Sequence, residues 1–293
     1  MQLIDGKATA KAIRQEIAAE VAAMIDSGKN GPHLAAVLVG DDPASQTYVA
    51  SKEKACREVG MTSSVYRLPA SASEDEVLEV VDYLNGDPEI DGFIVQLPLP
   101  RHIDEQKIIQ RINPEKDVDG FHPVNVGRMA LNLPAYISAT PMGIMELIRR
   151  YNIDTEGKRV VVLGRSNIVG SPISILLSRK ASPGNATVTL CHSRTKRLKQ
   201  IAKSADILIV AMGQPNFVKA DMVKKDAVVI DVGIHRIPSV ETKSGYKLTG
   251  DVDFDEVSKI ASMITPVPGG VGPMTIVSLL MNTLKAAKKE IYT

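Results

Sequence analysis

A tyrosine and a lysine stand four residues apart in a segment with helical spacing. Tyr48 and Lys52 therefore share one face of the expected helix. Apolar residues at Val49, Cys56 and Val59 place the lysine within an apolar stripe. Because partial burial lowers the pKa of a lysine toward neutrality, this position suits a group that transfers protons. The alternative is a lysine that extends its ammonium into solvent above a core tyrosine.

Three polar side chains that follow could accompany this pair. Gln96 ends an otherwise apolar strand beside Pro98, where a buried amide needs hydrogen-bond partners. Asp117 and Asp119 lie in the loop that comes next, and carboxylates there can accept hydrogen bonds from a ligand. Each aspartate could instead be a turn or capping residue.

A glycine turn in the second half of the chain has the features of a dinucleotide site. An apolar strand leads into Gly164-Arg-Ser-Asn-Ile-Val-Gly170, and a helix with Pro172 in its first turn follows. The N-terminus of such a helix aims backbone N–H groups at a pyrophosphate. The usual G-x-G-x-x-G pattern has Ser166 in place of its middle glycine, which predicts a less close approach to the phosphates. A purely structural connection between strand and helix is the alternative.

The residues after the next strand indicate which dinucleotide is bound. NAD is usually held there by a carboxylate about 20 residues beyond the turn, but this chain has Cys191-His-Ser-Arg-Thr-Lys-Arg197. The excess of cations suits a 2′-phosphate, so the sequence favours NADP, with Arg165, Ser193 and neighbouring Arg194 as contacts. The alternative is a solvated basic turn.

A segment rich in glycine and proline near the end of the chain could cover a ligand. Residues 265–275 read Thr-Pro-Val-Pro-Gly-Gly-Val-Gly-Pro-Met-Thr, a stiff loop with exposed backbone groups between a strand and a helix. A plain turn is the alternative.

The elements that must position these groups alternate between strand and helix. Residues 113–141 are rich in helix breakers and separate two such series, so we expect one domain over 1–138, completed by the last helix within 275–293, and a doubly wound nucleotide-binding domain over 139–274. The expected strands are 34–39, 65–68, 92–97, 159–163, 187–190, 206–211, 227–232 and 263–267, and the expected helices include 8–25, 45–59, 73–84 and 275–290.

Composition narrows the possible partners. With 35 basic and 34 acidic residues among 293, nothing favours nucleic acid or a membrane surface, and a small molecule is the expected partner. The two cysteines, Cys56 and Cys191, have no metal-ligand spacing, so no metal site is expected. The absence of a leader pattern or a long apolar run predicts a soluble, cytoplasmic protein.

Together these motifs resemble the bifunctional methylenetetrahydrofolate dehydrogenase/methenyltetrahydrofolate cyclohydrolases. The resemblance covers essentially the whole chain. It implies an N-terminal three-layer α/β domain and a C-terminal Rossmann NAD(P)-binding domain with the active site in the cleft between them, assembled as a homodimer through the Rossmann domains. The matching motifs are Tyr48-Val-Ala-Ser-Lys52, Val95-Gln-Leu-Pro-Leu-Pro100, Lys116-Asp-Val-Asp-Gly120, Thr140-Pro-Met-Gly143, Gly164-Arg-Ser-Asn-Ile-Val-Gly170 and Pro268-Gly-Gly-Val-Gly-Pro-Met274.

The resemblance also implies a role for individual residues. Lys52 is the catalytic lysine, Tyr48 stacks on the substrate, Gln96 contacts the lysine and Asp119 grips the pterin. Further substrate contacts are Val95, Leu97, Pro268, Gly269, Gly270, Val271, Gly272 and Pro273, and the cofactor contacts are Gly164, Arg165, Ser166, Gly170, Ser193 and Ile234. One departure is that Ser138-Ala139 stand where the family usually has Pro-Cys, so any role of that cysteine is absent.

The implied activity is NADP-dependent oxidation of 5,10-methylenetetrahydrofolate to the methenyl compound, followed by hydrolysis to 10-formyltetrahydrofolate. This activity belongs to one-carbon metabolism and supplies purine biosynthesis. Two alternatives remain: an NADP dehydrogenase for a carbon-linked hydroxyl, such as that of shikimate, and an idle sensor of NADP or folate that acts through a partner. The Tyr-x-x-x-Lys spacing also occurs in short-chain dehydrogenases, but there the dinucleotide turn precedes the pair.

Overall fold

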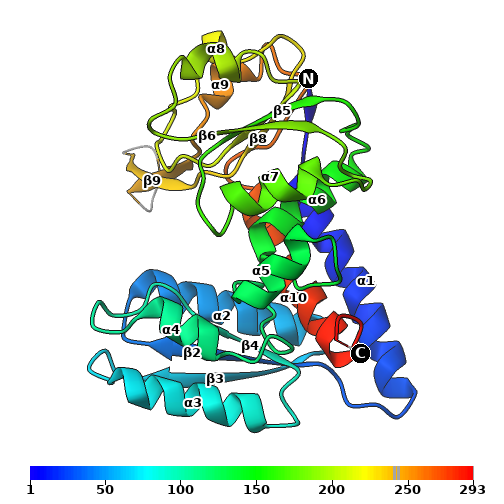
Figure 1. Ribbon diagram of the computed structural model, residues 1–293, viewed down its shortest axis with the longest axis vertical. Coiled ribbons are helices and arrows are strands. Elements are labelled where there is room, and N and C mark those ends of the chain that lie inside the picture. The colour runs from blue at the N-terminus through cyan, green and yellow to red at the C-terminus, as the bar shows by residue number, and fades with distance from the viewer. Residues whose placement is uncertain (240–241, 243–244, 293) are drawn as a thin grey trace. The chain divides into compact units, whose positions relative to one another are not determined.

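A computed structural model describes residues 1–239, 242 and 245–292, which divide into two compact units (Figure 1). Unit 1 comprises Met1–Ala10 and Thr140–Thr275, and unit 2 comprises Lys11–Ala139 and the chain from Ile276. The first ten residues belong to unit 1 because strand β1 (Gln2–Leu3) pairs in parallel with β11 (Met263–Ile264). This pairing joins the start of the chain to a strand 261 positions later, and local periodicity does not indicate it.

Unit 2 is built on a three-stranded parallel sheet in the order β3-β2-β4. The strands are β2 (His33–Val39), β3 (Thr62–Leu68) and β4 (Gly92–Val95), and all four residues of β4 are buried. Helices α2 (Pro43–Glu58) and α3 (Glu74–Gly86) cover opposite faces of this sheet (Figure 1). This confirms the expected three-layer α/β architecture.

Local signals in the sequence explain where these helices begin. Asp42 caps α2 by accepting a hydrogen bond from the backbone N–H of Ser45 over 2.8 Å, and Pro43 occupies the first helical position. Ser73 and Glu76 form a capping box at the start of α3. Buried Val77, Val81 and Leu84 then attach α3 to the sheet.

The breaker-rich stretch is more ordered than expected. It contains α5 (Pro123–Ala130), and α6 (Ala139–Arg150) begins near its end; α4 (Glu105–Arg111) lies just before it. The Nδ1 atom of His122 accepts a hydrogen bond from the backbone N–H of Val124 and so caps α5. A histidine cap is too uncommon a signal to read from sequence alone.

Unit 1 contains a six-stranded parallel sheet in the order β1-β11-β8-β7-β5-β6. Helices lie on both of its faces, with α7 on one side and α8 and α9 on the other (Figure 1). This confirms the doubly wound Rossmann architecture. The remaining elements of unit 1 are β5 (Arg159–Leu163), α7 (Gly170–Ser178), β6 (Thr187–Cys191), α8 (Leu198–Ala202), β7 (Ile207–Val210), η1 (Ala220–Met222), β8 (Val228–Asp231), the antiparallel pair β9 (His235–Pro238) and β10 (Tyr246–Thr249), and α9 (Phe254–Val257).

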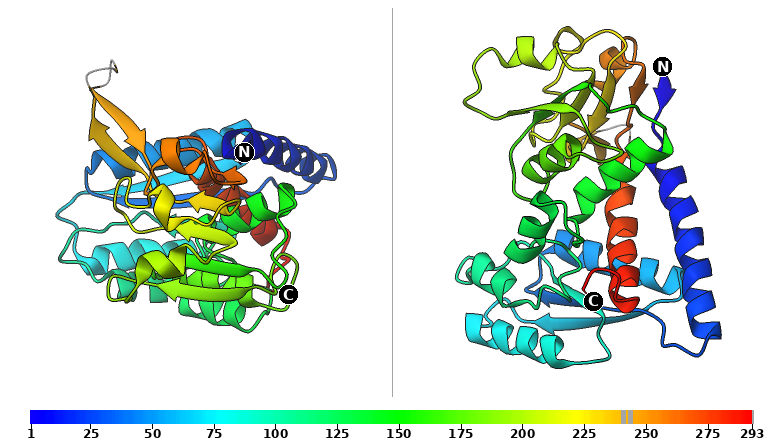
Figure 2. Two further views of the ribbon diagram at one scale, coloured as in Figure 1. Left: turned by 90° about the horizontal axis from the view of Figure 1, so that it is seen from above. Right: turned by 45° about the vertical axis from the view of Figure 1, so that its right-hand side comes forward.

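The two longest helices are α1 (Gly6–Asp26) and α10 (Val271–Ala287). Their C-terminal parts lie side by side in unit 2 (Figure 2), where Lys288 forms an ion pair with Glu20. Within the described residues, every helix is too short or too polar to cross a membrane. Cys56 and Cys191 are both buried free thiols.

Candidate active site

Helix α2 carries Lys52 into a partly buried position in unit 2. Val49, Cys56 and Val59, which share its stripe, are fully buried, and the lysine is half-buried. Its Nζ donates a hydrogen bond to Oε1 of Gln96 over 3.1 Å. Burial lowers the pKa of Lys52, while the charges of Asp119 and Cys56 act in the opposite direction. The lysine therefore points inward, as its place in the apolar stripe predicts.

Gln96 is oriented by its own surroundings. Its backbone N–H donates to the carbonyl of Val37 over 2.9 Å, which fixes the residue at the carboxyl end of β4. Its side-chain Nε2 donates to the carbonyl of Leu97 over 2.7 Å. Because the amide nitrogen is engaged there, the amide oxygen is the atom left to face Lys52. The amide thus has a definite orientation and offers the lysine an acceptor.

Asp119 lies close enough to Lys52 for their charges to interact. Burial raises the pKa of the Asp119 carboxyl, and the Lys52 ammonium opposes that rise. Its loop is held by Asn282, whose Nδ2 donates to the carbonyls of Val118 and Ile137. The structure therefore brings Lys52, Gln96 and Asp119 together, although they stand far apart in the sequence.

Tyr48 lies one helical turn before Lys52 and leaves 49% of its surface exposed. A large aromatic ring this exposed offers a face to a flat ligand.

Val95 and Leu97, unlike the exposed Tyr48, pack into the protein core. Val95 is buried in the cluster against α3, and Leu97 packs against the same cluster. Any ligand contact by Val95 therefore involves its backbone.

Asp117 has a different role from Asp119. Its carboxylate accepts hydrogen bonds from the backbone N–H groups of His122 and Phe121 and from Nδ2 of Asn125. Burial raises its pKa to about 7. The side chain is buried and its oxygens already have partners, so Asp117 shapes the loop instead of gripping a ligand. This corrects the expectation that both aspartates could bind.

The glycine-rich run of unit 1 is only partly a loop. Helix α10 begins at Val271, so Val271, Gly272 and Pro273 form its first turn. Gly269 has a φ of 104°, a conformation that favours glycine. Pro268 and Gly272 are exposed, whereas Gly270 is buried. The expectation of a loop through Thr275 was wrong, because Pro273 is tolerated within the first turn of a helix.

Helix α1 holds this run closely. A Cβ atom added at Gly6 would lie 1.8 Å from the carbonyl oxygen of Gly270, and the backbone N–H of Lys7 donates to the carbonyl of Gly269. The run is therefore fixed on one side by the first turn of α1.

The glycine turn after β5 is tightly packed. Gly164 has a φ of 114°, and a Cβ atom there would lie 2.1 Å from the carbonyl oxygen of Ala211. A Cβ atom at Gly170 would lie 1.9 Å from the carbonyl oxygen of Gly164. Ser166 Oγ accepts hydrogen bonds from the backbone N–H groups of Val169 and Gly170, at 3.2 and 3.5 Å. The serine therefore closes the turn from within.

A cavity of about 240 Å³ lies beside this turn at the carboxyl ends of β5, β6 and β7. This is where doubly wound sheets bind ligands. Arg165 and Ser193 are both exposed at its wall, as a contact to a 2′-phosphate requires. Its lining includes Gly164, Arg165, His192, Ser193, Met212 and Gln214. Of the expected cofactor contacts, Ser166, Gly170 and Ile234 do not line it; Ile234 is 51% exposed on the loop after β8.

Two family models match the chain and show to which protein family it belongs. The tetrahydrofolate dehydrogenase/cyclohydrolase catalytic domain matches residues 4–119, and the NAD(P)-binding domain of the same family matches residues 138–291. The chain belongs to this family.

Individual members of the tetrahydrofolate dehydrogenase/cyclohydrolase family are similar to this chain over nearly their full length. The bifunctional protein FolD of Phocaeicola vulgatus is 63% identical over 100% of both chains. The bifunctional FolD of Campylobacter jejuni has a TM-score of 0.93 and 48% identity, covering 99% of both chains. The Trypanosoma brucei enzyme, solved with NADP cofactor and inhibitor, has a TM-score of 0.92 and 40% identity over 99% of this chain and 98% of that one.

Sequence reasoning missed one set of polar residues in this family member. Asp251 is completely buried and accepts hydrogen bonds from the backbone N–H groups of Met212 and Gln214, which line the cavity. Asp231, at the end of β8, is also buried, and burial raises its pKa to about 6. The only sequence signal that could have marked these aspartates is a glycine within two residues of each, as in Asp231-Val-Gly233 and Gly250-Asp251.

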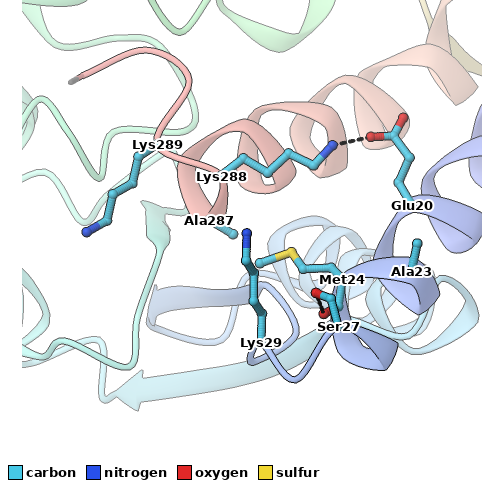
Figure 3. A pocket seen from close by; sticks show the side chains of 8 residues that line it. All are labelled: Glu20, Ala23, Met24, Ser27, Lys29, Ala287, Lys288 and Lys289. Atoms are coloured by element: carbon cyan, nitrogen blue, oxygen red, sulfur yellow. Dashed lines mark hydrogen bonds and ion pairs between the residues drawn. The ribbon is translucent and has the colours of Figure 1, made fainter.

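A larger cavity of about 600 Å³ lies in unit 2 between the ends of α1 and α10 (Figure 3). Figure 3 shows Lys288 extending toward Glu20, with which it pairs. Lys288 directly follows the last residue of α10, where a cation interacts favourably with the helix dipole. None of the expected site residues lines this cavity.

Proposed function

We propose that this chain oxidises 5,10-methylenetetrahydrofolate to 5,10-methenyltetrahydrofolate with NADP⁺ and hydrolyses the product to 10-formyltetrahydrofolate. The observation that carries the proposal is the half-buried Lys52, which is hydrogen-bonded to Gln96 and interacts with the charge of Asp119. Family membership supports the substrate, because the relatives are FolD enzymes. It also favours a folate over the shikimate-type alternative.

The oxidation requires alignment more than acid–base chemistry. The methylene bridge lies between two amine nitrogens, so loss of hydride produces an amidinium cation directly and no proton has to be removed. When bound, NADP⁺ supplies the hydride acceptor. The contribution of the protein is to hold the folate in a reactive orientation and to exclude water. The exposed ring of Tyr48 is suited to stack on the flat pterin.

The hydrolysis requires proton transfer, and we assign that work to Lys52. Water attacks the methenyl carbon and must lose a proton, and N5 must gain a proton as the ring opens. A lysine whose pKa is lowered by burial can accept the first proton and donate it to N5. The hydrogen bond to Gln96 holds the lysine in one position. The overall step consumes one water and releases one proton.

Asp119 is assigned to substrate binding. The pterin edge offers amine and amide N–H donors, which a carboxylate accepts strongly. The charge of Lys52 favours the ionised form of Asp119, which is the form that accepts. We also assign the backbone of Val95 and Leu97 and the run from Pro268 to Pro273 to contacts with the substrate.

The residues around the turn after β5 fit an NADP molecule. Gly164 and Gly170 leave room where a side chain would collide with backbone, and the cavity presents Arg165 and Ser193 to a 2′-phosphate. No acidic residue follows β6 before Arg197 to hold a free ribose hydroxyl. We assign Ser166 and Ile234 to the same site, Ser166 by shaping the turn. The T. brucei relative was solved with NADP.

We also propose where the enzyme works and how it assembles. We place it in the cytoplasm as a homodimer formed through unit 1, in one-carbon metabolism that serves purine biosynthesis. Buried free thiols at Cys56 and Cys191 are consistent with a reducing compartment. Strand β6 is an edge of the six-stranded sheet and leaves Leu190 exposed, which suits an interface between two copies.

The test is to incubate the purified protein with 5,10-methylenetetrahydrofolate and either NADP⁺ or NAD⁺ while following reduced cofactor and methenyl product by absorbance. We expect reduced NADP to accumulate while the methenyl product stays low, because hydrolysis removes it. A methenyl product that builds up in step with reduced cofactor would contradict the cyclohydrolase assignment. Absence of turnover with both cofactors would favour a sensor of NADP or folate.

A further inference from the structure

Four hydrogen-bond donors converge on the carboxylate of Asp251 in unit 1. Three are consecutive backbone N–H groups of the loop after β7, and the fourth is the imidazole of His235. The donors are Met212 N–H to Oδ2 at 2.6 Å, Gly213 N–H to Oδ2 at 3.0 Å, Gln214 N–H to Oδ1 at 2.8 Å, and His235 Nε2–H to Oδ1 at 2.7 Å. Each carboxylate oxygen therefore accepts two hydrogen bonds.

Two of the backbone donors border the cofactor cavity. Met212 and Gln214 line this cavity. His235 directly follows Ile234, which is exposed on the loop after β8. These loops leave the carboxyl ends of β7 and β8, the edge at which doubly wound sheets bind ligands. One buried side chain thus ties the loop that lines the cavity to the segment that follows β8.

The chemistry of the four contacts requires a carboxylate. An ionised aspartate only accepts hydrogen bonds and has room for about four donors. Asparagine would turn one acceptor oxygen into an N–H donor, which would face two existing donors. Because Asp251 is completely buried, water cannot replace the lost acceptor. The contact also sets the tautomer of His235, since Nε2 must carry the hydrogen that it donates.

The position of Asp251 is itself fixed by its neighbours. Its backbone N–H donates to Oδ1 of Asp231 over 3.0 Å, and its carbonyl accepts from the backbone N–H of Val218 over 2.9 Å. A Cβ atom at Gly233 would lie 2.5 Å from Oδ1 of Asp251. The position of the carboxylate is therefore fixed, and the loops that donate hydrogen bonds to it are fixed with it.

We propose that Asp251 is a positioning residue for the dinucleotide site, holding the Met212–Gln214 loop and the Ile234–His235 segment in the conformation that receives NADP. The inference rests on the proposed function, which identifies the cavity as the NADP site. It assigns Asp251 no contact with the folate and no proton transfer. Loss of its carboxylate should weaken dinucleotide binding while the hydrolysis of methenyltetrahydrofolate, which needs no dinucleotide, continues.

The test compares Asp251→Asn with the unmodified full-length protein in two measurements. NADP affinity is measured by calorimetric titration, and cyclohydrolase activity is measured with methenyltetrahydrofolate in the absence of dinucleotide. We expect NADP affinity to fall by about tenfold or more, as expected for a disrupted buried hydrogen-bond network, with cyclohydrolase activity retained. The matched control is Asp253→Asn, which changes a surface aspartate paired with Lys219 and should leave NADP affinity unchanged.

A second pair of variants decides the matter if Asp251→Asn does not fold. His235→Leu removes one donor and should weaken NADP binding, whereas His235→Gln supplies an amide donor and should restore much of it. Unchanged NADP affinity in Asp251→Asn, or equal affinities in the two His235 variants, would overturn the proposal. If the unmodified protein binds no NADP, the proposed function itself fails, and the inference fails with it.

Discussion

The ammonium of Lys52 and the side-chain oxygen of Gln96 are joined by a hydrogen bond of 3.1 Å. The other end of the amide is held by the carbonyl of Leu97. Burial lowers the pKa of Lys52, and Asp119 is the largest influence that opposes it. The protonation of this lysine is therefore set by a small number of identifiable neighbours.

Gln96→Glu should change the pH dependence of the hydrolysis. A carboxylate beside Lys52 favours the charged ammonium and raises the pKa of the lysine. Because the neutral amine accepts the proton from water, the rising part of the cyclohydrolase profile should move to higher pH by about one unit or more. Gln96→Met removes the acceptor without adding charge and should not move the profile upward. Identical profiles for unmodified protein and Gln96→Glu would show that Lys52 does not govern this limb.

Asp119→Ala should abolish folate binding. The variant loses the buried carboxylate that we assign to the pterin edge, and loss of a charged hydrogen-bond partner weakens both activities. Calorimetric titration with a folate ligand measures the effect. Glu115→Ala, on the exposed part of the same loop, is the matched control and should bind normally. Folate affinity that is unchanged in Asp119→Ala would refute the assignment.

Ser193→Asp should reverse the preference between cofactors. A carboxylate at this wall of the cavity would repel a 2′-phosphate and accept a hydrogen bond from a 2′-hydroxyl. We expect NADP affinity to fall by about tenfold or more, while NAD affinity stays equal or rises. Ser193→Ala, which adds no charge, should change NADP affinity less. An NADP-to-NAD affinity ratio that is the same in both variants would contradict this placement of the phosphate.

Asp117→Asn should remove part of the pH dependence of stability. The pKa of Asp117 is raised to about 7 in the fold, whereas an unfolded aspartate has a pKa of about 4. Between these values the folded protein holds a proton that the unfolded chain has released, so stability falls as pH rises through this window. The slope from this one group is up to about 1.4 kcal/mol per pH unit.

Urea midpoints between pH 4 and pH 8 measure this effect. Other raised carboxyls, such as that of Asp231, contribute equally to both proteins, so the difference between the two curves isolates Asp117. The curve of Asp117→Asn should be flatter across the window. Parallel curves would show that Asp117 has no raised pKa.

The parts of the fold with a strong local signal could be predicted from sequence. The stripe of Val49, Cys56 and Val59 placed Lys52 on an inward face, and the glycine turn after β5 marked the cavity beside it. Both depend on periodicity or on turn residues within a few positions of one another. The hydrogen bond between Lys52 and Gln96 was expected only from family resemblance, because the residues are 44 positions apart.

Other features depend on contacts that local sequence does not encode. Asp117 and Asp119 look alike in the sequence, and only the donors of His122 and Asn125 reveal that Asp117 is already occupied. The two-residue strand β1 exists because β11 is available to pair with it. Asp251 collects donors from 16 to 39 positions away, so no short motif indicates its role.

We assign Lys52 to the hydrolysis and expect no need for it as an acid or base in the oxidation. Lys52→Met keeps most of the aliphatic side chain and removes the amine, and both activities can be measured on one preparation. We expect the cyclohydrolase rate of this variant to fall by roughly 10² to 10⁴, while NADP-dependent oxidation of methylenetetrahydrofolate falls much less. Equal losses in the two activities would contradict this assignment of Lys52.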